Sequence, residues 1–119
     1  MILLTAVLVV AVLFFMFFRK NKSSEINILI KKSAYWATTA QQDSSPKTAM
    51  LHANYAVGYY HALKDIATDK EIHSACGVDI VKFGEHILNV QEMVTKKVIK
   101  ECPEFEGHVD LYLSTISNM

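Results

Sequence analysis

The chain has 119 residues, of which 51% are hydrophobic, and its 12 basic and 12 acidic side chains give a formal net charge of zero. This length allows one modest domain, and the balanced charge lacks the basic excess typical of nucleic-acid-binding proteins. Nucleic acid is therefore not an expected partner.

The hydrophobic residues are concentrated in residues 1–18, "MILLTAVLVVAVLFFMFF", which contain no charged side chain. At 1.5 Å per residue a helix of this length reaches roughly 27 Å, close to the ~30 Å hydrocarbon core of a bilayer. A backbone in lipid must satisfy its own hydrogen bonds, so this run predicts a transmembrane helix. The side chains expected to anchor it in lipid include Leu3, Leu8, Val12, Phe14, Phe15, Phe17 and Phe18.

A cleaved signal peptide is the competing interpretation of this run. Signal peptides have a basic segment before the apolar run and small residues at the cleavage site. Here no basic residue precedes the run, and it ends in bulky Phe17 and Phe18. The pattern favours a retained, single-pass anchor.

The residues that follow the anchor predict its orientation. Arg19, Lys20 and Lys22 come directly after the apolar run. By the positive-inside rule these basic residues set the topology and place the rest of the chain on the cytosolic side. Cys76 and Cys102 are then expected to be reduced thiols.

Residues 19–24, "RKNKSS", are interpreted as a short basic linker between the anchor and a helical domain. A linker this short keeps the domain near the lipid headgroups. Lys31 and Lys32 would then be able to meet anionic lipid.

Helical periodicity and end signals divide the remaining chain into helices. The first is expected to begin at Glu25, with Ser23 or Ser24 as its N-cap. A proline at the first helical position begins the second. The expected ranges are 25–42, 46–67, 69–76 and 80 to about 101.

Three end signals are particularly specific. Thr68 and Glu71 have the spacing of a capping box, and Gly77 can end that short helix in the left-handed conformation. Asp79 is a plausible N-cap for the longest segment, whose apolar residues recur at helical spacing. Residues 106–119 form a tail that is either weakly helical or coil.

The fold class expected from these elements is all-α, with one N-terminal transmembrane helix followed by a small antiparallel bundle over residues 25–105. The helix through residues 51–66 is apolar over most of its circumference, as a central bundle helix should be. Gly58 is expected to leave space for Trp36 or Phe83. The residues expected to pack the helices are Trp36, Ala53, Val57, Gly58, Leu63, Ile66, Phe83 and Ile87.

The histidines and tyrosines of the segment "LHANYAVGYYHALKDIATDKEI" raise the question of chemistry. His61 and Asp65 lie one helical turn apart and could share a metal, but a zinc site needs three or four converging ligands. No nucleophile elbow, phosphate-binding glycine loop or local Cys–His signature is present. We therefore expect packing, with no catalysis, metal, cofactor or small-molecule substrate.

The segments "LHANYA-GY" at 51–59, "ALKDIATD" at 62–69 and "CP-F" at 102–105 resemble a domain in small structural proteins of large algal DNA viruses, which are nucleocytoplasmic large DNA viruses. The resemblance covers about residues 28–105. It implies a membrane-anchored minor capsid protein that ties the internal viral membrane to the capsid shell.

The same resemblance implies partners and a location. The partners would be the lipid bilayer and other capsid or virion proteins. Such viral membranes derive from host endoplasmic reticulum, so the helical domain would lie on the cytosol-derived, capsid-facing side. The alternative is a single-pass accessory subunit of a cellular membrane protein complex, which also needs one short anchor and one small helical domain.

Overall fold

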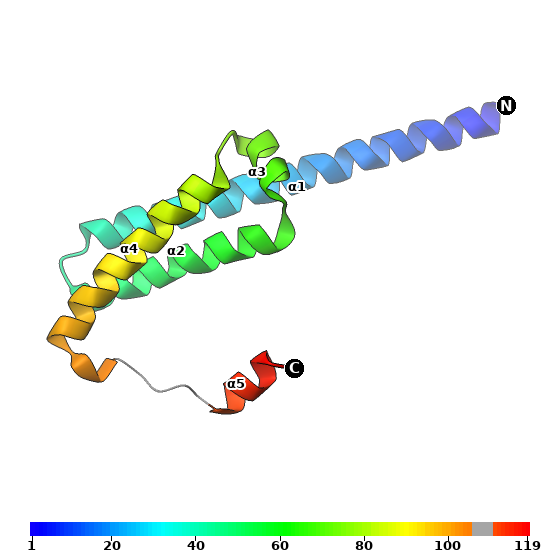
Figure 1. Cartoon of the computed structure of the whole chain (residues 1–119). Coiled ribbons are helices and arrows are strands. Elements are labelled where there is room, and N and C mark those ends of the chain that lie inside the picture. Colours follow the sequence, from blue (N-terminus) through cyan, green and yellow to red (C-terminus); the bar gives the residue numbers. More distant parts are fainter. Residues whose placement is uncertain (106–110) are drawn as a thin grey trace.

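The computed structural model describes residues 1–105 and 111–119 of the chain. The described part consists of helices and their connections, without a strand (Figure 1). This confirms the expected all-α class with a long apolar N-terminal helix. The elements are α1 (Ile2–Gln42), α2 (Pro46–Ile66), α3 (Asp69–Cys76), α4 (Ile80–Glu101), a short 3-10 helix at Pro103–Phe105, and α5 (Leu111–Ser117).

The most important departure from expectation is the continuity of α1, which runs through residues 19–24 without a break. The expected linker is helix, and Ser23 and Ser24 do not cap a new one. A serine can cap only where the first turn has free backbone N–H groups, and a helix that is already under way has none. No glycine or proline interrupts this stretch, so each further residue adds one more hydrogen bond at little cost.

The other helix ends follow the local signals closely. Thr68 and Glu71 form the reciprocal capping box of α3, and Gly77 ends that helix with a left-handed φ of 71°. The Asp79 carboxylate accepts hydrogen bonds from the first backbone N–H groups of α4. Ser45 occupies the N-cap position of α2 before Pro46, although its side chain makes no capping hydrogen bond.

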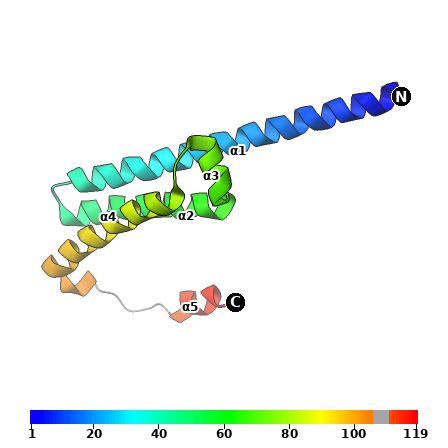
Figure 2. The same ribbon diagram turned by 45° about the horizontal axis from the view of Figure 1, so that its top comes forward.

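The helices α1, α2 and α4 form the bundle, and α3 lies beside α1 where α1 emerges from it (Figures 1 and 2). The C-terminal half of α1 runs away from the apolar end of the chain, and α2 returns beside it. Helix α4 then runs outward again across the pair. As a result α3 and the start of α4 lie at the end near the apolar segment, whereas the α1–α2 turn and the end of α4 lie at the far end.

The core consists of successive layers along the hairpin of α1 and α2. The layer nearest the apolar segment contains large aliphatic residues, and the far layer is dominated by alanine and valine. Small residues allow close helix approach, as shown by the buried Ser33 hydroxyl, which donates to the Ala56 carbonyl across the α1–α2 interface at 2.7 Å. The largest fully buried apolar side chains, each contributing about 1.5–3 kcal/mol, are Ile26, Leu63, Ile72, Ile80 and Val98.

Candidate functional site

Among the described residues, one helix, α1, is long and apolar enough to cross a bilayer, and its apolar window is entirely exposed. All of the expected anchor residues lie there with exposed side chains: Leu3, Leu8, Val12, Phe14, Phe15, Phe17 and Phe18. Phe14 and Phe18 contact each other edge-to-face with ring centroids 4.6 Å apart. An apolar surface of this extent needs a cover, which a bilayer supplies.

The three basic residues expected to set topology have different surroundings. Arg19 and Lys20 are exposed on α1 directly after the apolar run. Lys22 is only partly exposed, and its Nζ forms an ion pair with the Glu71 carboxylate of α3 at 2.7 Å. Lys22 therefore also joins two helices, a role that its spacing from the apolar run did not indicate.

Helix α3 packs against α1 where the apolar segment meets the bundle. We call this part of α1, with α3, the junction. One Glu71 oxygen accepts a hydrogen bond from the backbone N–H of Thr68, and the other accepts one from Lys22. The hydrogen bond from Lys22, followed by that from Thr68, holds the pKa of Glu71 below its ordinary value. On α1, the Asn27 side chain donates to the Ala75 carbonyl at 3.4 Å. These polar contacts hold α3 against α1 at the junction, and the buried Ile72 side chain of α3 adds an apolar contact there.

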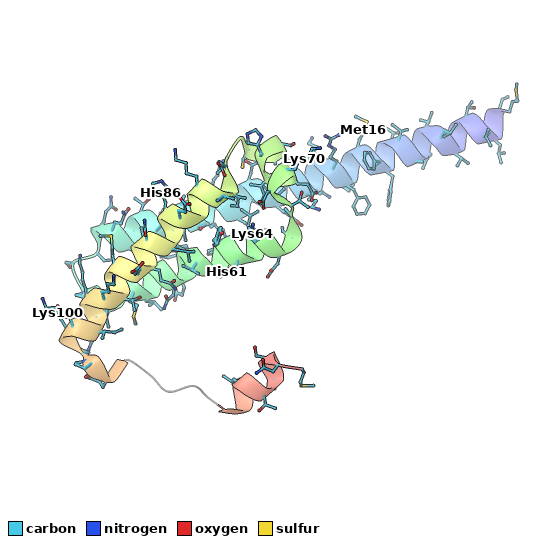
Figure 3. All side chains as sticks on the ribbon, viewed as in Figure 1. Met16, His61, Lys64, Lys70, His86 and Lys100 are labelled. Atoms are coloured by element: carbon cyan, nitrogen blue, oxygen red, sulfur yellow. The ribbon has the colours of Figure 1, made fainter. Side chains whose placement is uncertain are left out.

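A groove of about 760 Å³ lies between α1 and α3 at the junction. Its apolar end is formed by Phe15 and Phe18, which belong to the exposed apolar segment. Farther along α1 the lining becomes polar and includes Arg19 and Lys22, and α3 contributes Lys70. Figure 3 shows Lys70 on α3 at the end of the bundle from which the Met16 segment emerges. The remaining lining residues are Asn21, Ser23, Glu25, Ile26, Glu71, Ser74 and Ala75.

Most of the expected packing residues lie in the bundle core. Ala53, Val57, Leu63 and Ile87 are buried, and Trp36 and Phe83 are partly buried against them. Two of the set were wrong: Gly58 is exposed with open space where a side chain would begin, and Ile66 is 40% exposed. Both are therefore surface positions of α2 rather than core positions.

The glycine that permits close packing is Gly84 on α4, which is buried. A methyl group added there would lie 2.7 Å from Cζ and 3.0 Å from Cε2 of Tyr60. The Tyr60 ring therefore occupies the space that a side chain at position 84 would need. The sequence offered no sign of this contact, because it depends on the register between α2 and α4.

A second polar arrangement escaped the sequence analysis at the α1–α2 turn. The Nδ1 atom of His52 lies 2.6 Å from a carboxylate oxygen of Asp43, and both side chains are partly buried. The His52 ring also packs against Trp36, with centroids 4.9 Å apart, and Trp36 meets Tyr55 edge-to-face at 5.2 Å. These contacts hold the far end of the hairpin together.

The residues considered for metal chemistry do not converge. His61 and Asp65 are both exposed on α2, where Figure 3 shows His61. Within residues 1–105 and 111–119, no group of three or more His, Cys, Asp or Glu side chains could hold a metal ion. Cys76 and Cys102 are free thiols, and the Cys76 thiol donates to the Ile72 carbonyl at 3.1 Å.

Comparison of the chain with protein-family models, curated proteins and solved structures finds no match. The resemblance to algal-virus structural proteins therefore rests on the sequence segments alone.

Proposed function

We propose that this chain is a structural, single-pass membrane protein whose helical bundle attaches a membrane to a protein assembly. The observation that carries this proposal is the continuity of α1, in which one helix contains both the exposed apolar segment and the first helix of the bundle. A rigid connection of this kind fixes the orientation of the bundle relative to the lipid, which a flexible linker would not do.

The continuous helix also defines how far the bundle stands from the membrane. Residues 19–42 extend about 36 Å along the helix axis at 1.5 Å per residue. On the same basis Lys31 and Lys32 lie about 18–20 Å beyond Arg19. The rigid helix holds them at that distance from the headgroups, whereas a flexible linker would let the bundle fold back toward the lipid. Lys32 instead lies over the Tyr59 ring, 5.5 Å from its centroid. The far end of the bundle is thus well separated from lipid and available to another protein.

The surface at that far end supports protein attachment. Tyr35 is 62% exposed, Leu51 is 48% exposed and Tyr55 is 44% exposed, all on the α1–α2 hairpin. Tyr35 and Tyr55 both contact the Trp36 ring, and Leu51 lies one helical turn before Tyr55. Neighbouring exposed aromatic and aliphatic side chains are typical of protein interaction surfaces. The end of α4 at Lys100 also points away from the apolar segment (Figure 3), whereas its start at Asp79 lies near the junction.

The resemblance at residues 28–105 supports a more specific version of this function. In this version the protein is a minor capsid protein anchored in the internal membrane of a large DNA virus. The basic residues after the anchor favour the cytosol-derived side for the bundle by the positive-inside rule, and that side faces the shell in such particles. The bundle would then bridge the space between membrane and capsid, without catalysis, cofactor or small-molecule substrate.

Mass spectrometry of purified particles tests the virion assignment. The protein should be present in many copies, should stay with the membrane fraction when the shell is removed, and should be released from the shell by detergent. A deletion of residues 107–119 should leave it in the membrane and weaken its attachment to the shell. Absence from particles, together with recovery in a cellular membrane complex, would instead establish the accessory-subunit alternative.

A further inference from the structure

The groove between α1 and α3 joins two kinds of surface that a phospholipid also combines. Its lower end is formed by Phe15 and Phe18 of the apolar segment, and the polar part that begins directly above them includes Arg19, Lys22 and Lys70. We propose that this groove binds one anionic phospholipid of the leaflet on the bundle side, with the headgroup phosphate between Arg19 and Lys70. The inference rests on the proposed membrane anchoring, and it adds an anionic phospholipid as a specific ligand of the junction.

The depth of the groove matches the headgroup layer. If the bilayer core ends near Phe18, the polar stretch from Arg19 to Glu25 rises about 10 Å along the helix. The headgroup region of one leaflet is roughly 5–8 Å thick, half the difference between the full bilayer and its hydrocarbon core. The upper groove therefore lies at the level of the phosphates, and its lower end opens toward the acyl chains.

The charges in the groove favour an anion. Lys22 and Glu71 neutralise each other through their ion pair. Arg19 and Lys70 are exposed, and the described part of the chain provides neither with an ion-pair partner. Glu25 also lines the groove, at the end farthest from Phe15, so it disfavours an anion deep inside the bundle. The site of most positive charge thus lies next to the lipid-facing end.

The shape of the site favours a lipid over a soluble anion or a peptide. A volume of about 760 Å³ is large for a single phosphate and falls in the range of pockets that hold drug-sized molecules. The apolar floor is continuous with the anchor, so an occupant with an acyl chain keeps that chain in the bilayer. A soluble anion would occupy only the polar part of the groove.

The test uses the full chain reconstituted into phosphatidylcholine vesicles that contain a minor share of phosphatidylglycerol. Electron spin resonance of spin-labelled versions of each lipid measures the fraction immobilised by the protein, and hence its relative preference for the two lipids. We expect a preference for phosphatidylglycerol of about fivefold or more, since each basic group near the surface contributes about that factor.

Three variants separate a defined site from diffuse charge attraction. The double variant Arg19→Gln with Lys70→Gln should reduce the preference for phosphatidylglycerol over phosphatidylcholine to a ratio near one. Ser74→Trp should do so too, because it fills the groove without changing any charge. The matched control, Lys20→Gln with Lys31→Gln, also removes two positive charges from α1 but none from the groove lining, and should keep most of the preference.

The outcomes distinguish this inference from the proposed function. Wild-type protein that floats with the vesicles but shows no lipid preference would overturn the inference and leave the anchoring intact. Equal loss of preference in the control variant would also overturn it, in favour of diffuse attraction. Protein that does not float would overturn the membrane anchoring and the lipid site together. Circular dichroism of each variant verifies that its helices are retained, and Ser74→Trp decides the matter if the double charge variant misfolds.

Discussion

The two glycines inside the bundle helices, Gly58 and Gly84, have different surroundings and therefore different effects on packing. Gly58 and Gly84 both lie inside helices, where glycine costs about 1 kcal/mol relative to alanine. The structure places Gly58 on an open surface and Gly84 against the Tyr60 ring. The same residue type is therefore a simple helix defect in α2 and a packing requirement in α4.

Substitution of each glycine by alanine should separate these two roles. Gly58→Ala should stabilise the protein by about 0.5–1 kcal/mol, because the helix gains propensity and nothing obstructs the methyl group. Gly84→Ala should be less stable than Gly58→Ala by about 1–3 kcal/mol, the usual cost of overpacking. Urea unfolding of the two variants measures the difference. Equal stability would mean that the Tyr60 ring moves away freely.

The two glycines also show what the sequence could reveal at this scale. The caps at Thr68, Glu71, Gly77 and Asp79 were predictable because each depends on residues within one helical turn. The Gly84–Tyr60 contact and the His52–Asp43 pair were not, because they depend on how separate helices are aligned. No local pattern distinguishes a glycine under a tyrosine ring from one facing solvent.

Among the elements, α1 determines whether the apolar segment and the bundle are connected rigidly or flexibly. The sequence correctly predicted an apolar helix and an amphipathic helix, but it gave a serine N-cap signal between them. A serine followed by a helical pattern predicts an N-cap in the sequence, whether the chain before it is coil or helix. Only the structure shows that the helix continues, with Lys22 contacting α3 from within the expected linker and Asn27 contacting α3 farther along α1.

Breaking α1 at the junction should uncouple the anchor from the bundle. Asn21→Pro removes a backbone donor and costs about 3 kcal/mol of local helix stability, while the bundle core begins later, at Ile26. Pulsed electron resonance between spin labels at Val10 and Lys97, in reconstituted protein, should show a broad distance distribution in the proline variant. Asn21→Ala is the matched control and should retain the narrow distribution of the parent. A narrow distribution in both would mean that α3 alone fixes the junction.

The contact between α3 and α1 should weaken in acid. The pKa of Glu71 is held below its ordinary value of 4.5, chiefly by the hydrogen bond from Lys22. A carboxylate with a lowered folded-state pKa contributes stability that is fully present above about pH 4.5 and is lost as the pH falls through the lower folded value. Hydrogen exchange of the α3 amides, corrected for intrinsic rates, should therefore accelerate below pH 4.5.

A matched variant isolates Glu71 from other acidic groups. Glu71→Gln should show faster α3 exchange at neutral pH and little further change on acidification. The pKa of Glu92 on α4 is lowered by its hydrogen bond from Lys96, so a global measurement would mix the two effects. Unchanged acid sensitivity in Glu71→Gln would assign the effect to a different group.

At the scale of the whole molecule, the apolar segment and the bundle are structurally separable although one helix connects them. No residue before Ile26 is buried, and the bundle core is contributed by residues from Ile26 onward. The apolar segment therefore adds surface for lipid without adding core. This division is consistent with a protein whose bundle folds through its own contacts and whose location depends on the first helix.

Deletion of residues 1–18 should consequently give a soluble, folded helical domain that no longer reaches the membrane. The truncated α1 would begin at Arg19 and would still contain Lys22, Asn27 and the buried Ile26, so its contacts with α3 would remain. Circular dichroism should show cooperative unfolding of a helical protein, and flotation should leave the truncated domain at the bottom of the gradient while the full chain rises with vesicles. If the truncated domain still floated, the surface of the bundle would itself bind lipid, and the apolar segment would not be the anchor that the proposed function requires. If it failed to fold, the anchor would have to stabilise the bundle through the Phe15 and Phe18 end of the groove, and the division between anchor and core would be wrong.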